Sequence, residues 1–139
     1  GVDRSEDRLG RDHGQLPDNA LLVRADLVDF WRLAYQAGWA PEYHFLLYPN
    51  PYPKAGHLKM RWHGHAVLPT LLALGGHLEL RSNWSLYVEE FALAVAQVTG
   101  KQAAVTEIAP KDDYLTPFEA KYARSGQALW RLCVELERT

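Results

Sequence analysis

An asparagine and a lysine, Asn50 and Lys54, stand in a short polar stretch that contains three prolines, at positions 49, 51 and 53. Proline donates no ladder hydrogen bond and forces the preceding residue into extended geometry, so this stretch must end the apolar run before it and must be stiff. A rigid polar loop at the carboxyl end of a buried strand is where open α/β sheets bind ligands. We therefore interpret Tyr48–Lys54 as the floor of an active site.

Basic and aromatic side chains are concentrated directly after this loop. The twelve positions 54–65 hold Lys54, His57, Lys59, Arg61, His63 and His65, with Trp62 among them. Basic groups neutralise phosphates and flat rings stack on bases, so the segment suits nucleic-acid binding, with a solvated cationic loop as the alternative. The formal net charge of the chain is −2, so such binding must come from a local patch. We expect no metal site at His63 and His65, because alternate residues of a helix start point apart.

Two acids near the N-terminus, Asp3 and Asp26, each follow a short apolar segment. In dinucleotide-binding folds, an acid at the end of the second strand holds a ribose hydroxyl about 20 residues after a glycine-rich loop. If Asp3 has this role, the first strand and its glycine loop lie before residue 1. The alternative is that Asp3 is a turn acid and Asp26 a helix N-cap.

The elements that position these residues alternate between strand and helix. We expect strands over 1–3, 20–23, 43–48, 77–81, 103–108 and 129–136. We expect helices between Asp26 and Gly38, within 62–74 and from Ser85 to Gly100, with a capped turn at Thr116. This alternation predicts a mostly parallel sheet with helices on both faces. The predicted buried face of the long third helix consists of Leu86, Phe91, Ala94, Val95 and Val98.

Length and composition set the class of protein. The 139 residues predict a single domain, 1–139, with enough core to fold. One cysteine, Cys133, excludes an internal disulfide framework and a cysteine-only metal site, and its apolar neighbours predict a buried core thiol. No apolar run approaches the ~20 residues of a membrane span and no signal peptide is visible, so we expect a cytoplasmic protein without a membrane partner.

Taken together and in order, these stretches resemble the bacterial TrmB family of tRNA (guanine-N7-)-methyltransferases. That family's strand-end motif, phenylalanine-proline-aspartate-proline-tryptophan with a lysine two residues on, is similar to Tyr48–Tyr52 and Lys54. Its basic segment resembles His57–Arg61, and its threonine-aspartate-tryptophan resembles Ser82–Trp84. Its threonine-x-aromatic-glutamate motif, followed by a lysine and glycine-glutamine, is similar to Thr116, Phe118, Glu119, Lys121, Gly126 and Gln127.

The resemblance implies a Rossmann-like class I methyltransferase domain whose first strand and glycine loop lie outside this chain, which would then be N-terminally truncated. It implies S-adenosylmethionine as the methyl donor and a guanine of tRNA as the acceptor. Asp3, Asp26 and Asn50 would bind the cofactor, and Asn50 would also stand at the catalytic position. The nucleotide or RNA backbone would be bound by Lys54, His57, Lys59, Arg61, Asn83, Thr116, Pro117, Phe118 and Glu119.

Departures from the family pattern leave other functions open. Asn50 and Asn83 replace aspartates and Met60 replaces a basic residue; an asparagine keeps a carbonyl acceptor but loses the negative charge. The alternative is therefore a catalytically degenerate relative that binds RNA or a partner. A methyltransferase acting on a small molecule or another RNA is a further alternative, and a plain interaction domain another. We also expect an N-terminal segment or a second copy of the chain to complete the sheet, because buried unpaired backbone groups cost ~1–3 kcal/mol each.

Overall fold

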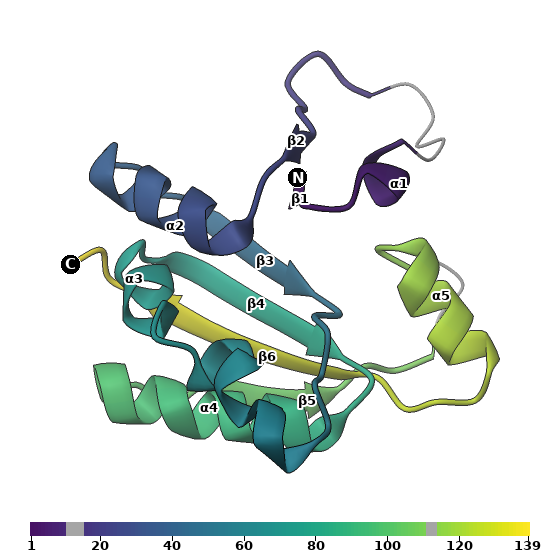
Figure 1. Ribbon diagram of the computed structural model, residues 1–139. Coiled ribbons are helices and arrows are strands. Elements are labelled where there is room, and N and C mark those ends of the chain that lie inside the picture. Colours follow the sequence, from purple (N-terminus) through teal and green to yellow (C-terminus); the bar gives the residue numbers. More distant parts are fainter. Residues whose placement is uncertain (11–15, 111–113) are drawn as a thin grey trace. The chain divides into compact units, whose positions relative to one another are not determined.

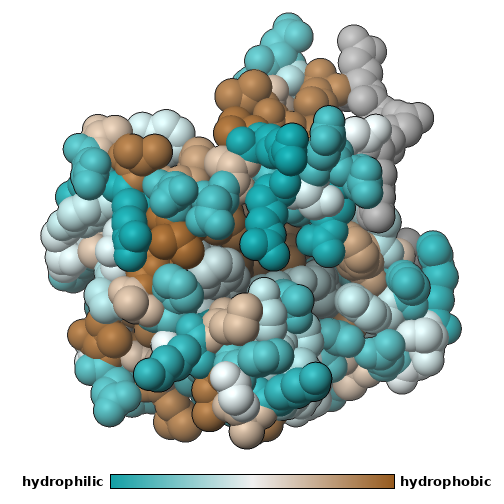
Figure 2. Space-filling model, viewed as in Figure 1, coloured by the Kyte–Doolittle hydropathy of each residue, from teal (hydrophilic) through white to brown (hydrophobic). Residues whose placement is uncertain are grey.

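The computed structural model describes residues 1–10, 16–110 and 114–139 (Figure 1). The chain forms two compact units, Gly1–Trp39 and Ala40–Thr139. Within the described ranges, no helix has the length and apolar character that crossing a bilayer requires. On the face shown in Figure 2, hydrophobic residues are interspersed with hydrophilic ones.

The first unit contains two short parallel strands and two helices. Strand β1 (Val2–Asp3) pairs with β2 (Val23–Arg24), which starts later than the predicted strand over 20–23. Helix α1 (Glu6–Leu9) begins after Ser5, whose hydroxyl accepts a hydrogen bond from the backbone of Arg8. Helix α2 (Leu27–Gln36) begins after Asp26 and is followed by a glycine with φ of 79° at position 38. The predicted start and end of this helix are confirmed.

The second unit is built on a four-stranded sheet in the order β3-β4-β6-β5. Its strands are β3 (Tyr43–Leu47), β4 (Gly76–Ser82), β5 (Ala104–Glu107) and β6 (Trp130–Leu136). The α/β class is confirmed, but the prediction of a mostly parallel sheet is wrong for this unit. Only β3 and β4 run parallel, whereas β6 is antiparallel to both β4 and β5. The physical reason is that α5 (Pro117–Arg124) lies beyond the end of the sheet, so β6 starts at the edge where β5 ends and runs back (Figure 1).

Helix α4 (Ser85–Thr99) packs on one face of this sheet. Its buried side chains are Tyr87, Val88, Phe91 and Val95, and the sheet presents Leu78, Leu80 and Leu132 in the same core. Phe91 and Val95 are confirmed as core residues. Leu86 and Val98 are exposed and Ala94 is half-buried, because the helix begins so that the stripe 87/88/91/95 faces the strands. The left-handed Gly100 ends the helix as predicted.

The segment between β3 and β4 is helical but broken. It contains the short 3₁₀ helices η1 (Ala55–Met60) and η2 (Trp62–Gly64), followed by α3 (Leu68–Ala73). Pro69 lies in the first turn of α3, where a missing N–H costs nothing, so the helix starts later than position 62. Gly76 then has φ of 83°, and a Cβ there would stand 2.0 Å from the carbonyl oxygen of Pro41.

Two predictions about burial are wrong. Strand β3 is an edge strand of this sheet and buries only Leu46, while Tyr43 and Phe45 are exposed. Cys133 is half-buried and faces away from α4, because Leu132 and Val134 on either side of it occupy the core face of β6. The opposite face of the sheet is therefore partly polar.

Candidate functional site

The second unit brings three of the predicted nucleotide-binding stretches to the end of its sheet at which β3 and β4 terminate. β3 and β4 are parallel, so the loop Tyr48–Lys54 and the residue Asn83 both leave the sheet at this edge. Helix α5 follows β5 at the same edge and carries the predicted segment Thr116–Glu119 (Figure 1). Three stretches that are distant in sequence thus meet at one end of the sheet.

A buried carboxylate joins these stretches. The side chain of Glu119 is 0% exposed and accepts a 2.7 Å hydrogen bond from the Tyr48 hydroxyl. Arg81 Nη1 donates to both Glu119 oxygens, at 2.9 and 3.1 Å, and the backbone N–H of Leu115 donates at 3.1 Å. Thr116 caps the helix by accepting from the backbone N–H of Glu119. The carboxylate therefore fixes α5 against the ends of β3 and β4.

The electrostatics of this network keep Glu119 ionised. Burial alone would raise its pKa, but the hydrogen bonds from Tyr48 and Arg81 outweigh burial and hold the pKa below the ordinary value. Burial and the neighbouring carboxylate both raise the pKa of Tyr48, so the phenol stays protonated as a donor. Burial would lower the pKa of Arg81, but its carboxylate partners raise it. The network is consequently an ion pair with a neutral phenol.

The proline loop has an unusual backbone. Its two tyrosines, Tyr48 and Tyr52, have φ of 50° and 43°, which lie in the left-handed region that non-glycine residues rarely adopt. Between them, Asn50 is exposed and its side-chain oxygen accepts a 3.2 Å hydrogen bond from the Tyr52 backbone. Strained backbone of this kind persists only where neighbours over-determine it, and it concentrates at functional sites.

Arg61 supplies much of that restraint. Its side chain is only 4% exposed and donates to the carbonyl oxygens of Tyr52 and Pro53, at 3.1 and 3.4 Å. Its Nη1 contacts both oxygens of Glu90 on α4, and its guanidinium carbon lies 4.9 Å from the centre of a Trp84 ring. In this arrangement the charge of Arg61 is directed at internal partners and holds the loop to α4.

The remaining basic residues of the segment are more accessible. Lys54 and Lys59 are exposed, and His57 is half-buried against the ring of Tyr52, at 6.0 Å between ring centres. His63 is instead turned inward, where its Nε2 contacts Glu90 at 3.0 Å, and His65 Nδ1 accepts from the Val67 backbone. The surface available to a phosphate is therefore formed by the two lysines and His57.

Asn83 is coupled to the far end of α5. Its side-chain amide nitrogen donates to Gln127 Oε1 at 2.7 Å, and Gln127 in turn donates to the Ser125 hydroxyl at 3.2 Å. Asn83, where the TrmB pattern has an aspartate, and Gln127 of the glycine-glutamine pair are thus direct neighbours in space.

Asp3 and Asp26 belong to the first unit, where both make the local bonds of the alternative interpretation. Asp3 accepts from the Ser5 backbone at 2.9 Å and lies 3.6 Å from Arg8. Asp26 accepts from the backbone N–H groups of Val28 and Asp29. A role for either acid in cofactor binding stays a prediction.

Sequence reasoning missed Arg81, Tyr48 and Glu90 as partners of the predicted site residues. A signal existed for Arg81, because an arginine that alternates with leucines in a strand is rarely buried without a carboxylate partner. Its partner Glu119 is 38 residues away in the sequence, so spacing alone does not identify the pair.

Two histidines and two glutamates with lowered pKa values predict that the free energy of unfolding falls on acidification. Burial lowers the pKa of His44 and His63 below 6.5, and Glu79 and Glu119 have pKa values below 4.5 because of their hydrogen bonds. The unfolded chain then binds more protons, so the free energy of unfolding decreases as the pH falls below about 6.5 and again below about 4.5. Denaturant titrations at pH 8, 6, 5 and 4 measure this; equal unfolding free energies at pH 8 and 5 would contradict the contribution of the histidines.

The chain is similar to curated proteins that share one name. The chain is 28% identical over 120 residues to a tRNA (guanine-N(7)-)-methyltransferase of Neisseria meningitidis serogroup C, and the match covers 83% of the chain and 50% of the relative. It is 32% identical over 123 residues to the protein of that name from Acidithiobacillus ferrooxidans, covering 84% and 53% respectively. No family model matches the chain. The chain thus spans about half the length of these curated relatives.

Proposed function

We propose that this chain is a member of the TrmB-like family of tRNA (guanine-N7-)-methyltransferases and that it forms the substrate-binding part of an enzyme that methylates N7 of a guanine in tRNA. One observation carries the proposal: the loop Tyr48–Lys54, Asn83 and Thr116–Glu119 meet at one edge of the sheet. The finer fold assignment, a Rossmann-like class I methyltransferase, is part of the same proposal.

S-adenosylmethionine would supply an electrophilic methyl group on a sulfonium. The residues present suit such a ligand in chemistry, because carboxylates accept hydrogen bonds from ribose hydroxyls and the Asp3 side chain remains 32% exposed at the end of β1. We propose that Asp3 binds the ribose, Asp26 lies beside the adenine and Asn50 stands between the methyl donor and the guanine. A segment or second copy completing the sheet also remains a proposal.

The reaction needs orientation more than proton transfer. Guanine N7 carries an in-plane lone pair and no proton at neutral pH, so bond formation to the methyl carbon requires no base, and the electron pair of the broken bond stays on sulfur. Holding the two atoms in line and excluding water can contribute roughly 7–11 kcal/mol. The restrained loop suits this task, since Asn50 and Lys54 lose little further freedom on binding.

The predicted RNA-binding residues differ in exposure, and we propose different roles for the accessible and the buried ones. Lys54, His57 and Lys59 are accessible and would contact phosphates or the target nucleotide. Thr116, Pro117 and Phe118 surround the start of α5, where Pro117 is exposed. Arg61 and Glu119 are buried and bonded internally, so we propose that both act as positioning residues. Asn83 would contact the nucleotide beside Gln127.

Asn50→Asp in the full-length protein tests this function. Restoring a carboxylate beside the guanine stabilises the positive charge that the base gains as the sulfonium loses it. A gain of about 1.4 kcal/mol in the transition state would raise methyl transfer about tenfold. The measurement is transfer of radiolabelled methyl to a tRNA transcript. A transcript with 7-deazaguanine, which lacks the N7 lone pair, is the substrate control and should accept no methyl.

Calorimetry with S-adenosylmethionine separates the alternatives. Cofactor binding without any rise in transfer for Asn50→Asp would contradict the assigned role of Asn50. Absence of cofactor binding by the full-length protein, with tRNA still bound, would support the catalytically degenerate alternative. That alternative is favoured by one specific observation, the replacement of two family aspartates by Asn50 and Asn83.

A further inference from the structure

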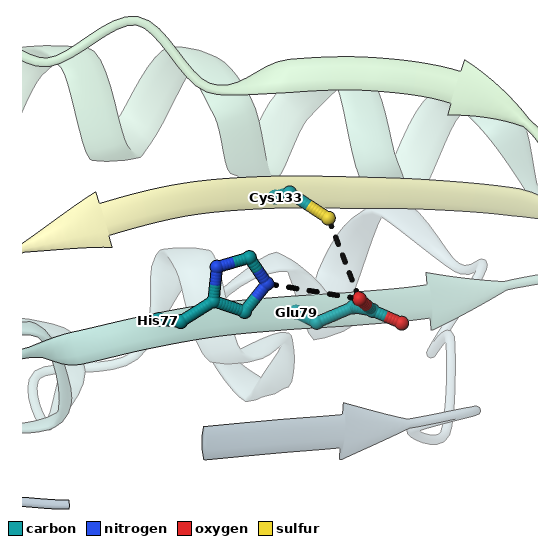
Figure 3. Close-up of side chains that lie close together, drawn as sticks. All are labelled: His77, Glu79 and Cys133. Atoms are coloured by element: carbon teal, nitrogen blue, oxygen red, sulfur yellow. Dashed lines mark hydrogen bonds and ion pairs between the residues drawn. The ribbon is translucent and has the colours of Figure 1, made fainter. Parts of the chain in front are cut away.

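Three different kinds of metal-ligating side chain meet on the polar face of the second unit's sheet, away from the edge described above. His77 and Glu79 lie on β4 and Cys133 lies on β6, where it is the register partner of Glu79 (Figure 3). Glu79 Oε1 is 3.8 Å from His77 Nε2 and 3.5 Å from Cys133 Sγ. All three ligand atoms lie within 4.8 Å of one another.

Two of these separations are close to those of a tetrahedral zinc centre, and the third needs only side-chain adjustment. Zinc bonds of about 2.0–2.1 Å to nitrogen and oxygen and about 2.3 Å to sulfur place neighbouring ligand atoms roughly 3.3–3.7 Å apart. The two separations at Glu79 are close to this range without rearrangement of the backbone. Imidazole, carboxylate and thiolate are also the three ligand types that zinc takes from proteins.

A fourth residue holds His77 in the orientation that a ligand needs. Glu135, the register partner of His77, contacts its Nδ1 through a short hydrogen bond. With the Nδ1 proton donated to Glu135, the Nε2 lone pair faces Glu79 and Cys133. Metal-binding histidines characteristically donate their other ring N–H to a carboxylate in this way.

The Glu79 carboxylate is also held in an orientation that suits a metal ligand. It is 7% exposed, and Arg81 Nε donates to its Oε2 at 2.7 Å, which leaves Oε1 directed at His77 and Cys133. The hydrogen bond from Arg81 thus orients the carboxylate so that its second oxygen faces the other two ligand atoms.

The site is open to solvent. His77, Cys133 and Glu135 line a surface depression of about 480 Å³ together with Lys101 and Gln102. This depression gives an ion a path to His77 and Cys133, beside Glu79, and leaves room for a water molecule as the fourth ligand.

We propose that His77, Glu79 and Cys133 bind one divalent cation of the zinc class, with Glu135 orienting His77. The proposal does not rest on the proposed methyl transfer, although Arg81 bonds both Glu79 and Glu119. Spacing in the sequence does not identify this cluster, because Glu79 and Cys133 are 54 residues apart. The competing arrangement is a protonated His77 between two carboxylates, with a protonated Cys133 donating to Glu79.

The experiment measures zinc bound per chain on the 139-residue protein at pH 8, after removal of metal and addition of zinc. One zinc per chain is expected, and Cys133→Ser should abolish stoichiometric binding. Cobalt(II) should give a thiolate-to-metal charge-transfer band that is absent in Cys133→Ser. Glu135→Gln, at an exposed position, should weaken binding about 10–100-fold without unfolding the chain.

His57→Gln, which removes another histidine of the same unit, is the matched control and should leave zinc binding unchanged. The proposal is overturned if the wild-type chain binds no zinc at pH 8, or if Cys133→Ser keeps both one zinc and an unchanged cobalt spectrum. Equal loss in His57→Gln and Cys133→Ser would overturn it too, because the zinc would then be held by the basic segment.

Discussion

Replacing Glu119 by glutamine is expected to lower the free energy of unfolding by about 3 kcal/mol, the lower end of the cost of breaking a buried ion pair, because Arg81 keeps its second carboxylate partner, Glu79. The described partners of the Glu119 carboxylate are donors: the Tyr48 hydroxyl, the Arg81 guanidinium and the Leu115 N–H. Glutamine offers one acceptor oxygen and turns an NH₂ group toward donors. Denaturant unfolding of the variant and the wild type measures the difference.

Two further variants make this result specific. Tyr48→Phe removes a single hydrogen bond to a charged group and should cost about 1.5–3 kcal/mol. Glu89→Gln, which changes an exposed carboxylate on α4, should stay within about 0.5 kcal/mol of the wild type. A loss below 1 kcal/mol for Glu119→Gln would show that the network does not hold α5 in solution.

Local signals predicted most of the elements, because each depends on a few neighbouring residues. Asp26 accepts the backbone N–H groups that a helix start leaves unpaired, and Gly100 supplies the left-handed residue that ends α4. These features need no knowledge of the distant chain.

Strand direction was not predictable in the same way. Whether β6 runs parallel or antiparallel depends on where the connection through α5 delivers the chain, and no residue within β6 encodes that position. The exposure of Tyr43 and Phe45 has the same origin, since an apolar strand looks the same in sequence at the edge and in the centre of a sheet.

The candidate site, like the fold, was predictable from the sequence only in part. The resemblance to the TrmB family implied that Asn50, Asn83 and Thr116 share one nucleotide site, and the three stretches that carry them meet at one end of the sheet. The resemblance did not distinguish accessible charges from buried ones. Arg61 and Lys59 stand two positions apart in one basic segment, yet Arg61 is enclosed by the loop and α4 while Lys59 is exposed.

That difference leads to the second large expected effect, from Arg61→Gln. The substitution removes the charge that contacts Glu90 and the donors to the carbonyl oxygens of Tyr52 and Pro53. Because Glu90 is itself partly exposed, we expect a loss of about 2–3 kcal/mol in unfolding free energy, less than for a fully buried pair. Lys59→Gln, the matched removal of an exposed positive charge, should change stability by less than about 0.5 kcal/mol.

The salt dependence of tRNA binding by the full-length protein separates positioning from phosphate contact. Each phosphate neutralised adds about one unit to the slope of log affinity against log salt concentration, because its counterions are released on binding. If Lys59 contacts a phosphate, Lys59→Gln reduces the slope by about one. Arg61→Gln should weaken binding through the loosened loop while leaving the slope unchanged. An equal reduction of the slope by both variants would mean that Arg61 leaves Glu90 to reach the RNA, and that the proline loop is rebuilt when tRNA binds.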